Sequence, residues 1–232
     1  MIFYSILYNL NNSTLYCNMF LCMLKTMIRT KTIGETDRYI VLADKDSMQV
    51  LKETNMLCNL EMIEIPKPSS HLEGMLYKYR LHEFLNLEGK ECWYLDVDML
   101  FVNQMKMFPA PDRLICFPEG SPTEKNYCGS FTLDAKVGVT AGCFAYNFGP
   151  LVKKTFERIK ELASQTSETF YTIEQPFFNK ALELNPPILL EPSLISFNGA
   201  NLEKARILNC AGEPGDAMFH WKKMFAFFLR FF

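Results

Sequence analysis

Two aspartates separated by one residue lie between two apolar runs near the middle of the chain. The motif Asp96-Val97-Asp98 follows the apolar run 92–95 and precedes a second one, 99–102. In an extended backbone, side chains two residues apart lie on the same face, so the two carboxylates would repel each other unless a cation neutralises them. Carboxylate oxygens are preferred ligands of hard cations such as Mg²⁺ and Mn²⁺, which also bridge to phosphate oxygens. The pattern therefore predicts a divalent-metal site at Asp96 and Asp98.

The first hundred residues alternate between patterns typical of strands and of helices. Apolar runs predict strands over 2–8, 38–43, 63–65 and 92–95, and apolar residues on one face predict helices over 14–28, 50–58 and 72–85. This alternation predicts an α/β fold with a mostly parallel sheet flanked by helices and joined by right-handed crossovers. Ligands bind such sheets beyond the carboxyl ends of the strands. We therefore expect Tyr8, Asn9 and Asp44, which follow the first two strands, to contact a ligand.

The second half of the chain has a less regular pattern. We expect strands over 114–118 and 139–146, helices over 151–163 and 174–184, and mostly loop after 185–187. A long irregular segment is typical of one that closes over a binding site.

Composition limits the classes of protein to which this chain can belong. It has 232 residues, 49% of them hydrophobic, and a formal net charge of −2, which favours one α/β domain and gives no reason to expect a nucleic-acid partner. The eight cysteines lack C-x-x-C spacing and lie mostly among apolar neighbours, as expected of reduced thiols in the cytoplasm.

The two ends of the chain are apolar, but neither has the length of a membrane span. Residues 1–10 lack a basic segment and a cleavage site, so we interpret them as a core strand and not as a signal peptide. No run reaches the roughly 18 apolar residues that a membrane span needs. We expect the aromatic tail, 224–232, to pack back on the domain. A peripheral membrane contact and a truncated boundary are the alternatives.

The D-x-D motif and its surroundings resemble the GT-A glycosyltransferases, most closely the glycogenin-like family 8 enzymes and the related small glycosyltransferases of large algal viruses. The resemblance implies a single GT-A domain over 1–232, with a nucleotide-binding half at 1–102 and an acceptor and sugar half at 103–232. In the family, a hydrophobic strand leads into D-x-D and a small strand then continues the sheet. The motif binds the diphosphate of the sugar donor through Mn²⁺ or Mg²⁺, here at Asp96, Val97 and Asp98.

Three further stretches match this family pattern. The segment Thr140-Ala141-Gly142, within 140–147, is similar to the N-A-G-x-x-x-x-N strand that lines the sugar site, with Thr140 in place of Asn. Glycine in a strand also marks close backbone packing, which is the alternative interpretation. The layout of 76–94 places Lys78 or Arg80 where a basic residue contacts the donor.

The third stretch is Glu174-Gln175, which is similar to the D-Q-x-x-x-N motif beside the transferred sugar, with Glu174 in place of Asp. The resemblance makes these two residues the catalytic candidates. A capping box, with Thr172 as the N-cap and Gln175 reaching back, is the alternative.

The carboxyl-terminal part departs from the family pattern. Family 8 members supply a third metal ligand from an H-x-x-G turn, and this chain has Asn209 where the His is expected. His220 follows, and a neutral imidazole is an acceptable Mn²⁺ ligand, so we prefer His220 to Asn209. Lys222 or Lys223 would then meet the diphosphate.

Together these features predict a divalent-metal-dependent hexosyltransferase. It would move a sugar from a nucleoside-diphosphate sugar to a hydroxyl of a glycan or protein acceptor, with retention of configuration as the family implies, and with Tyr8, Asn9 and Asp44 at the base and ribose. We expect it in the cytoplasm, or in the host cytoplasm if the chain is viral. A haloacid dehalogenase-like phosphatase, with Asp96 as nucleophile, and a non-catalytic sugar-nucleotide-binding protein are the alternatives.

Overall fold

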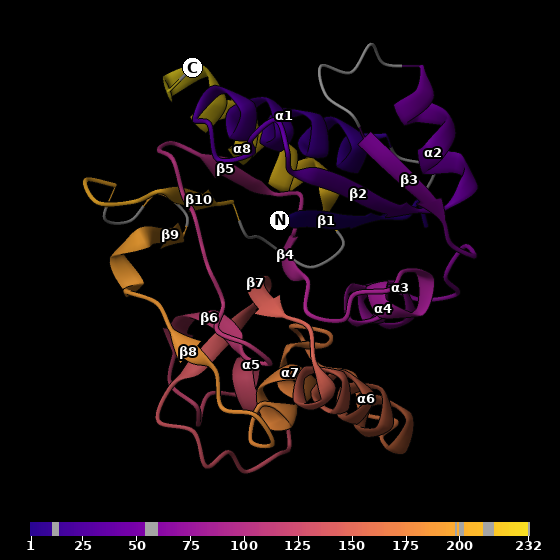
Figure 1. Cartoon of the computed structure of the whole chain (residues 1–232), viewed down its shortest axis with the longest axis vertical. Helices are drawn as coiled ribbons and strands as arrows, with labels where there is room; N and C mark the ends of the chain where they lie inside the picture. Colours follow the sequence, from indigo (N-terminus) through magenta and orange to yellow (C-terminus); the bar gives the residue numbers. More distant parts are fainter. Residues whose placement is uncertain (11–13, 54–59, 198, 200–201, 211–215, 232) are drawn as a thin grey trace. The chain divides into compact units, whose positions relative to one another are not determined.

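The computed structural model describes residues 1–10, 14–53, 60–197, 199, 202–210 and 216–231 (Figure 1). Backbone hydrogen bonds order seven strands as β3-β2-β1-β4-β7-β6-β8 and three more as β5-β10-β9. In the larger sheet β2 runs parallel to β3, β6 runs parallel to β8, and β6 runs antiparallel to β7. The predicted α/β class, with a mostly parallel sheet flanked by helices, is confirmed.

Tertiary contacts group the chain into two compact units whose residues interleave along the sequence. Unit 1 comprises Met1–Ile2, His71–Tyr94 and Met107–Pro192, and unit 2 comprises Phe3–Ser70, Leu95–Lys106 and Ser193–Phe232. The expected boundary at residue 102 lies inside a segment of unit 2. The assignment of one GT-A domain to 1–232 stays a prediction.

Unit 2 contains six strands, in two sheets, and the helices that pack on them. It contains most of β1 (Ile2–Leu7), β2 (Arg38–Ala43), β3 (Leu60–Glu64), the small-sheet strands β5 (Met99–Phe101), β9 (Ile195–Phe197) and β10 (Ile207–Asn209), and the helices α1 (Leu15–Arg29), α2 (Lys45–Lys52) and α8 (Ala217–Phe231). Helix α1 packs on β5 and lies beside α8 (Figure 1). The Thr26 hydroxyl in α1 accepts a hydrogen bond from the Phe101 N–H (3.0 Å), which fixes β5 against this helix.

Unit 1 contains the rest of the larger sheet and an aromatic core. Its strands are most of β4 (Glu91–Leu95), β6 (Leu114–Gly120), β7 (Gly138–Asn147) and β8 (Ile188–Leu189). Its helices are α3 (His71–Leu76), the 3₁₀ turn η1 (Tyr77–Tyr79), α4 (Leu81–Phe84), α5 (Lys125–Cys128), α6 (Pro150–Gln165) and α7 (Gln175–Ala181). The 3₁₀ turn η2 (Pro192–Leu194) lies where unit 1 ends and unit 2 resumes. Tyr79 stacks on Phe144 and Phe178, with centroids 5.7 and 5.6 Å apart. Asp112 caps α6, since its carboxylate accepts from the N–H groups of Leu151 and Val152.

Two predictions about local structure are wrong. The helix expected over 72–85 is interrupted at η1, because Tyr77, Lys78 and Tyr79 are all buried, and three successive side chains cannot lie on one face of an α-helix. The segment after 185–187 is not mostly loop, because it forms three short strands and the 15-residue α8. The tail 224–231 does pack against α1 through α8, with Met224 fully buried, as expected; Phe232 lies outside the described residues.

Candidate functional site

The D-x-D motif lies in the connection between β4 and β5. β4 ends at Leu95 and β5 begins at Met99, while the backbone turns at Val97 and Asp98. The argument that Asp96 and Asp98 share one face assumed an extended backbone and is therefore wrong. The strand that follows also does not continue the main sheet as the resemblance implied, because β5 pairs antiparallel with β10 in the small sheet.

This antiparallel pairing brings Asp98 next to the carboxyl-terminal end of β10. Met99 lies opposite Asn209, and the Cys210 N–H donates to the Asp98 carbonyl oxygen (2.9 Å). The structure therefore places Asn209, the residue at the position of the family His, on the strand that pairs with the end of the D-x-D motif.

Asp98 and His220 contact each other although 122 residues separate them. The distance from Asp98 Oδ2 to His220 Nδ1 is 3.1 Å, and the two side chains are 15% and 12% exposed. His220 reaches Asp98 from the first turns of α8, whose Met224 packs in the core of unit 2. Both candidates for the third ligand thus lie on elements that reach Asp98.

Two buried oxygens at this place have no hydrogen-bond partner among the described residues. They are Asp98 Oδ1 and Asn209 Oδ1. A buried carboxylate or amide oxygen without a partner costs free energy. An aspartate oxygen, an amide oxygen and an imidazole are all acceptable donors for Mg²⁺ or Mn²⁺. The chemical types of these three side chains therefore fit a divalent cation.

Among the described residues, no group of three His, Cys, Asp or Glu side chains lies close enough together to hold a metal ion. Asn209 is outside that set of residue types. A cation at this place would therefore depend on Asp98, Asn209 and His220 together, and on Asp96, which is only partly exposed at the end of β4.

The sequence analysis missed Tyr16 and Asp216. Burial, together with the carboxylates of Asp98, Asp216 and Asp96, raises the pKa of the Tyr16 hydroxyl to about 12. Three carboxylates therefore lie near one hydroxyl in the first turn of α1. The position of Tyr16 near the start of the helix predicted after the first strand was the available signal, because helices that follow parallel strands begin at the ligand-binding edge.

The Asp44 carboxylate accepts hydrogen bonds from backbone N–H groups of unit 2. Its Oδ1 accepts from the Ser47 N–H as the N-cap of α2, and its Oδ2 accepts from the Asn9 N–H (both 2.9 Å). The carboxylate is fully buried and ties the end of β1 to the start of α2. Tyr8 and Asn9 are partly exposed directly after β1. Their expected contacts with a base and ribose stay predictions.

In unit 1, Lys78 and Glu174 form a buried ion pair. Lys78 Nζ lies 2.5 Å from Glu174 Oε1, and the side chains are 0% and 5% exposed. The ammonium also donates to the Ala141 carbonyl oxygen (3.3 Å) and lies 4.8 Å from the centroid of the Tyr94 ring. A buried charge pair is tolerated where further hydrogen bonds satisfy both groups. Arg80, the other basic candidate, donates to Glu83 at the surface.

Gln175 connects α7 to β7. Its Oε1 accepts from the Ala141 N–H (3.2 Å), and its Nε2 donates to Glu119 Oε2 (3.4 Å), a carboxylate on β6 that the sequence analysis missed. The capping-box alternative is wrong, because the Thr172 hydroxyl donates to the Asn126 carbonyl oxygen and Gln175 reaches β7 instead.

The other residues of the E-Q-x-x-x-N and T-A-G stretches also pack closely. Asn179 Oδ1 accepts from the Val139 N–H, and its Nδ2 donates to the Val139 carbonyl oxygen (2.9 and 3.0 Å). The Thr140 hydroxyl accepts from the Gly142 N–H (3.2 Å), and Thr140 and Ala141 are buried. The structure therefore brings Lys78, Glu174, Gln175 and the 140–142 segment together in unit 1.

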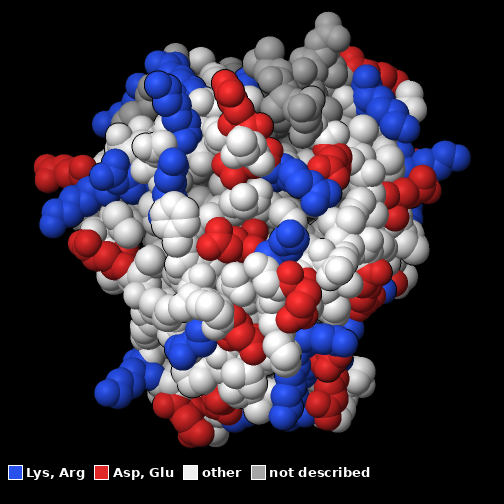
Figure 2. Space-filling view, in the orientation of Figure 1, with Lys and Arg blue, Asp and Glu red and all other residues white. Residues whose placement is uncertain are grey.

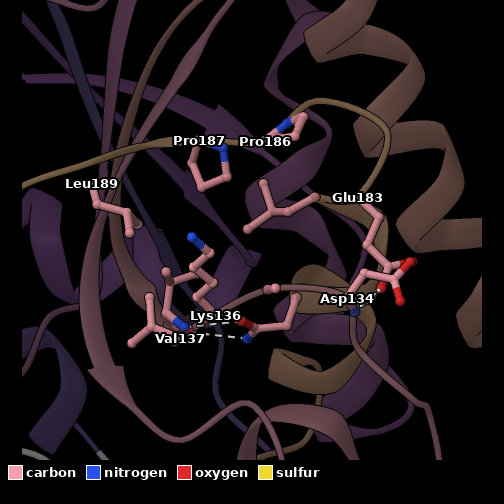
Figure 3. A pocket seen from close by; sticks show the side chains of 11 residues that line it. Asp134, Lys136, Val137, Glu183, Pro186, Pro187 and Leu189 are labelled. Atoms are coloured by element: carbon pink, nitrogen blue, oxygen red, sulfur yellow. Dashed lines mark hydrogen bonds between the residues drawn. The ribbon is translucent and has the colours of Figure 1, made fainter.

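A cavity of about 370 Å³ opens beside Asn179 in unit 1 (Figure 3). Figure 3 shows Pro186, Pro187 and Leu189 on one side and Val137 on another, with the carboxylates of Asp134 and Glu183 at one end. Glu183 accepts from the Asp134 N–H (2.9 Å) and pairs with Lys180. Asn179 is the motif residue that lines the cavity. Its side-chain amide donates hydrogen bonds to the carbonyl oxygens of Val139 on β7 and of Gln175.

Neither the models of known protein families nor the curated protein sequences give a match to this chain.

Proposed function

We propose that this chain is a divalent-metal-dependent glycosyltransferase of the GT-A type. It would transfer a sugar, with retention, from a nucleoside-diphosphate sugar to a hydroxyl of a glycan or protein acceptor. The observation that carries this proposal is the pair of buried oxygens, Asp98 Oδ1 and Asn209 Oδ1, that have no hydrogen-bond partner within the described part of the chain. Asp98 belongs to the D-x-D motif and contacts His220, and Asn209 lies on the strand that pairs with β5 directly after the motif. At this motif the GT-A enzymes bind the metal and diphosphate of the donor.

Asp98, Asn209 and His220, together with Asp96, are the residues that would hold Mn²⁺ or Mg²⁺. The bound ion supplies a Lewis acid that neutralises the departing diphosphate. Asp98 is already positioned by the Cys210 N–H at its carbonyl oxygen and by His220 at its carboxylate, so a cation would meet donors whose orientation is set in advance. Lys223 lies near enough to Cys210, the neighbour of Asp98, to oppose the rise that burial causes in the pKa of that thiol, so Lys223 would add positive charge at the diphosphate. The other expected residue, Lys222, is exposed on the outer side of α8.

Unit 1 carries the residues that we assign to the transferred sugar. Glu174 and Gln175 are the catalytic candidates, and 140–142 is the adjacent strand segment. Gln175 is held on both sides, by the Ala141 N–H and by Glu119, so its amide has a fixed orientation. The ion pair with Lys78 compensates the charge of Glu174, so we assign Lys78 the role of positioning this carboxylate.

We also propose a cytoplasmic location, or the host cytoplasm for a viral chain. Six of the seven cysteines that the structure describes are buried. Burial raises the pKa of Cys17 to about 11 and that of Cys210 to about 12, which keeps both thiols protonated at neutral pH. Such thiols are inert side chains of the core and are typical of a reducing compartment.

Binding of Mn²⁺ and of UDP- and GDP-linked sugars tests the proposal. We expect wild type to bind Mn²⁺ and to release one nucleoside diphosphate from one of these donors only with the metal. Asp98→Asn and Asn209→Ala should each weaken Mn²⁺ binding at least about tenfold. Asp46→Asn is the matched control, since Asp46 is an exposed aspartate of the same unit that pairs with Lys67. It should leave binding unchanged.

The same experiment separates the alternatives. Trapping of phosphate on Asp96 from small phosphoesters, with no donor bound, would favour the haloacid dehalogenase-like phosphatase. Donor binding without turnover in any acceptor or hydrolysis assay would favour the non-catalytic binding protein. Equal Mn²⁺ affinity in wild type and Asn209→Ala would remove the structural basis of the metal site.

A further inference from the structure

Helix α8 presents apolar side chains to solvent. Met218, Phe219, Phe225 and Leu229 are 48%, 47%, 43% and 67% exposed, whereas Met224 is fully buried against the rest of unit 2. Met218, Phe225 and Leu229 recur at spacings of seven and four residues, so they lie along one side of the helix. A surface helix normally turns polar residues outward. An apolar outward face of this size marks a contact surface.

The charges of α8 all have the same sign. Its residues include Lys222, Lys223 and Arg230 and no Asp or Glu. Lys222 and Arg230 are exposed, on the same outward half of the helix as Phe225 and Leu229. Figure 2 shows Lys and Arg side chains in the region where Figure 1 draws the end of α8, together with Asp or Glu side chains. The partner that this face fits therefore has an apolar interior and a negatively charged surface, as an anionic bilayer does.

The length of α8 decides how it would meet a bilayer. A helix of 15 residues is about 22 Å long, shorter than the roughly 30 Å of the hydrocarbon region. In the part of the chain that the structure describes, no helix is long and apolar enough to cross a membrane. The inner side of α8 packs against the rest of unit 2, where Met224 is buried and His220 contacts Asp98. Only its outward face is available, so the helix would lie in the plane of the interface.

We propose that the outward face of α8 is a peripheral membrane-docking surface for bilayers that contain anionic lipids. Phe225 and Leu229 insert among the acyl chains near the headgroups, and Lys222 and Arg230 meet lipid phosphates. This proposal rests on the surface of unit 2 alone and does not depend on the proposed transferase activity.

The two tryptophans of the chain allow a direct measurement. Trp93 is fully buried in β4, whereas Trp221 is partly exposed on α8, where it stacks on Phe225 at 5.4 Å. A change in intrinsic fluorescence on adding vesicles therefore reports on α8. We expect a blue shift and co-sedimentation with vesicles of phosphatidylcholine and phosphatidylglycerol, both reduced by salt, and neither with phosphatidylcholine alone. Trp221→Phe should abolish the shift while the protein still sediments.

Variants of exposed residues separate docking from folding. Leu229→Glu should weaken vesicle binding at least about tenfold, and Arg230→Gln about fivefold, with unchanged circular dichroism. Leu151→Glu is the matched control, because Leu151 is 48% exposed on α6 in the other unit. It should bind vesicles like wild type.

Three results would overturn the proposal. The first is equal binding to neutral and anionic vesicles, and the second is equal loss in Leu151→Glu and Leu229→Glu. The third is dimerisation in solution that Leu229→Glu abolishes while no vesicle binding is seen, which would assign the face to a second copy of the chain.

Discussion

The buried pair of Lys78 and Glu174 allows the sharpest test of the energetics of this fold. Replacing Lys78 by Met keeps the bulk of the side chain but removes the ammonium, which lies 2.5 Å from Glu174 Oε1. Glu174, 5% exposed, would then be a buried carboxylate without its compensating charge. Breaking a buried ion pair in this way costs about 3–5 kcal/mol of stability. That is a large part of the roughly 5–15 kcal/mol that stabilises a typical domain.

The double variant Lys78→Met, Glu174→Leu separates the pair from its surroundings. With both charges removed, no buried charge lacks a partner, so the double variant should be more stable than either single variant. Equilibrium urea unfolding of the wild type, the two single variants and the double variant measures this coupling.

Two outcomes would refute the reasoning. One is a loss below about 1 kcal/mol in Lys78→Met, which is typical of a surface pair. The other is a double variant that is no more stable than either single variant.

Three further predictions concern single residues. Asp44→Ala should destabilise the chain by about 2 kcal/mol or more, because the Ser47 and Asn9 N–H groups lose their acceptors. Urea unfolding measures the loss, and a change below about 0.5 kcal/mol would contradict this role. Burial lowers the pKa of His82 in the folded state, so wild type should lose stability as the pH falls below the unfolded value of about 6.5. His82→Phe should show a smaller fall in Tm between pH 7.5 and pH 5.5, and an equal fall in both proteins would argue against it. Gly129→Ala should lower Tm, since Gly129 has φ +55° and an added Cβ would lie 2.4 Å from the Phe170 ring; an unchanged melting curve would contradict that geometry.

The regular elements of the fold were predictable because their signals are local. The strand 38–43 was predicted with its observed bounds, since Ile40, Val41 and Leu42 form an apolar run and the polar Asp44 follows Ala43. The helix 151–163 followed from one apolar face and was observed as Pro150–Gln165. The break at η1 was not predictable in this way, because it depends on the buried partner of Lys78, which lies 96 residues further along the chain.

The candidate site was only partly predictable for the same reason. The D-x-D spacing pointed to Asp96 and Asp98, and the departures from the family pattern pointed to Asn209 and His220, but the contacts among them come from β10 and α8. The sequence analysis expected loop there, because the aromatic and methionine-rich run 217–231 is apolar on more than one side and shows no clear polar face. Glu119 was missed because its partner Gln175 lies on α7, and the sequence alone gives no cross-element pairing.

Helix α8 carries His220 on its inner side and the apolar face with Phe225 and Leu229 on its outer side. Two binding events on opposite sides of one rigid helix are thermodynamically linked wherever both require the helix in the same place. Binding of Mn²⁺ at His220 and binding of a bilayer at Leu229 would each restrict the motion of α8. Either event would therefore lower the cost in conformational entropy of the other. The affinity for vesicles should then rise on adding Mn²⁺ by the same factor as the affinity for Mn²⁺ rises on adding vesicles.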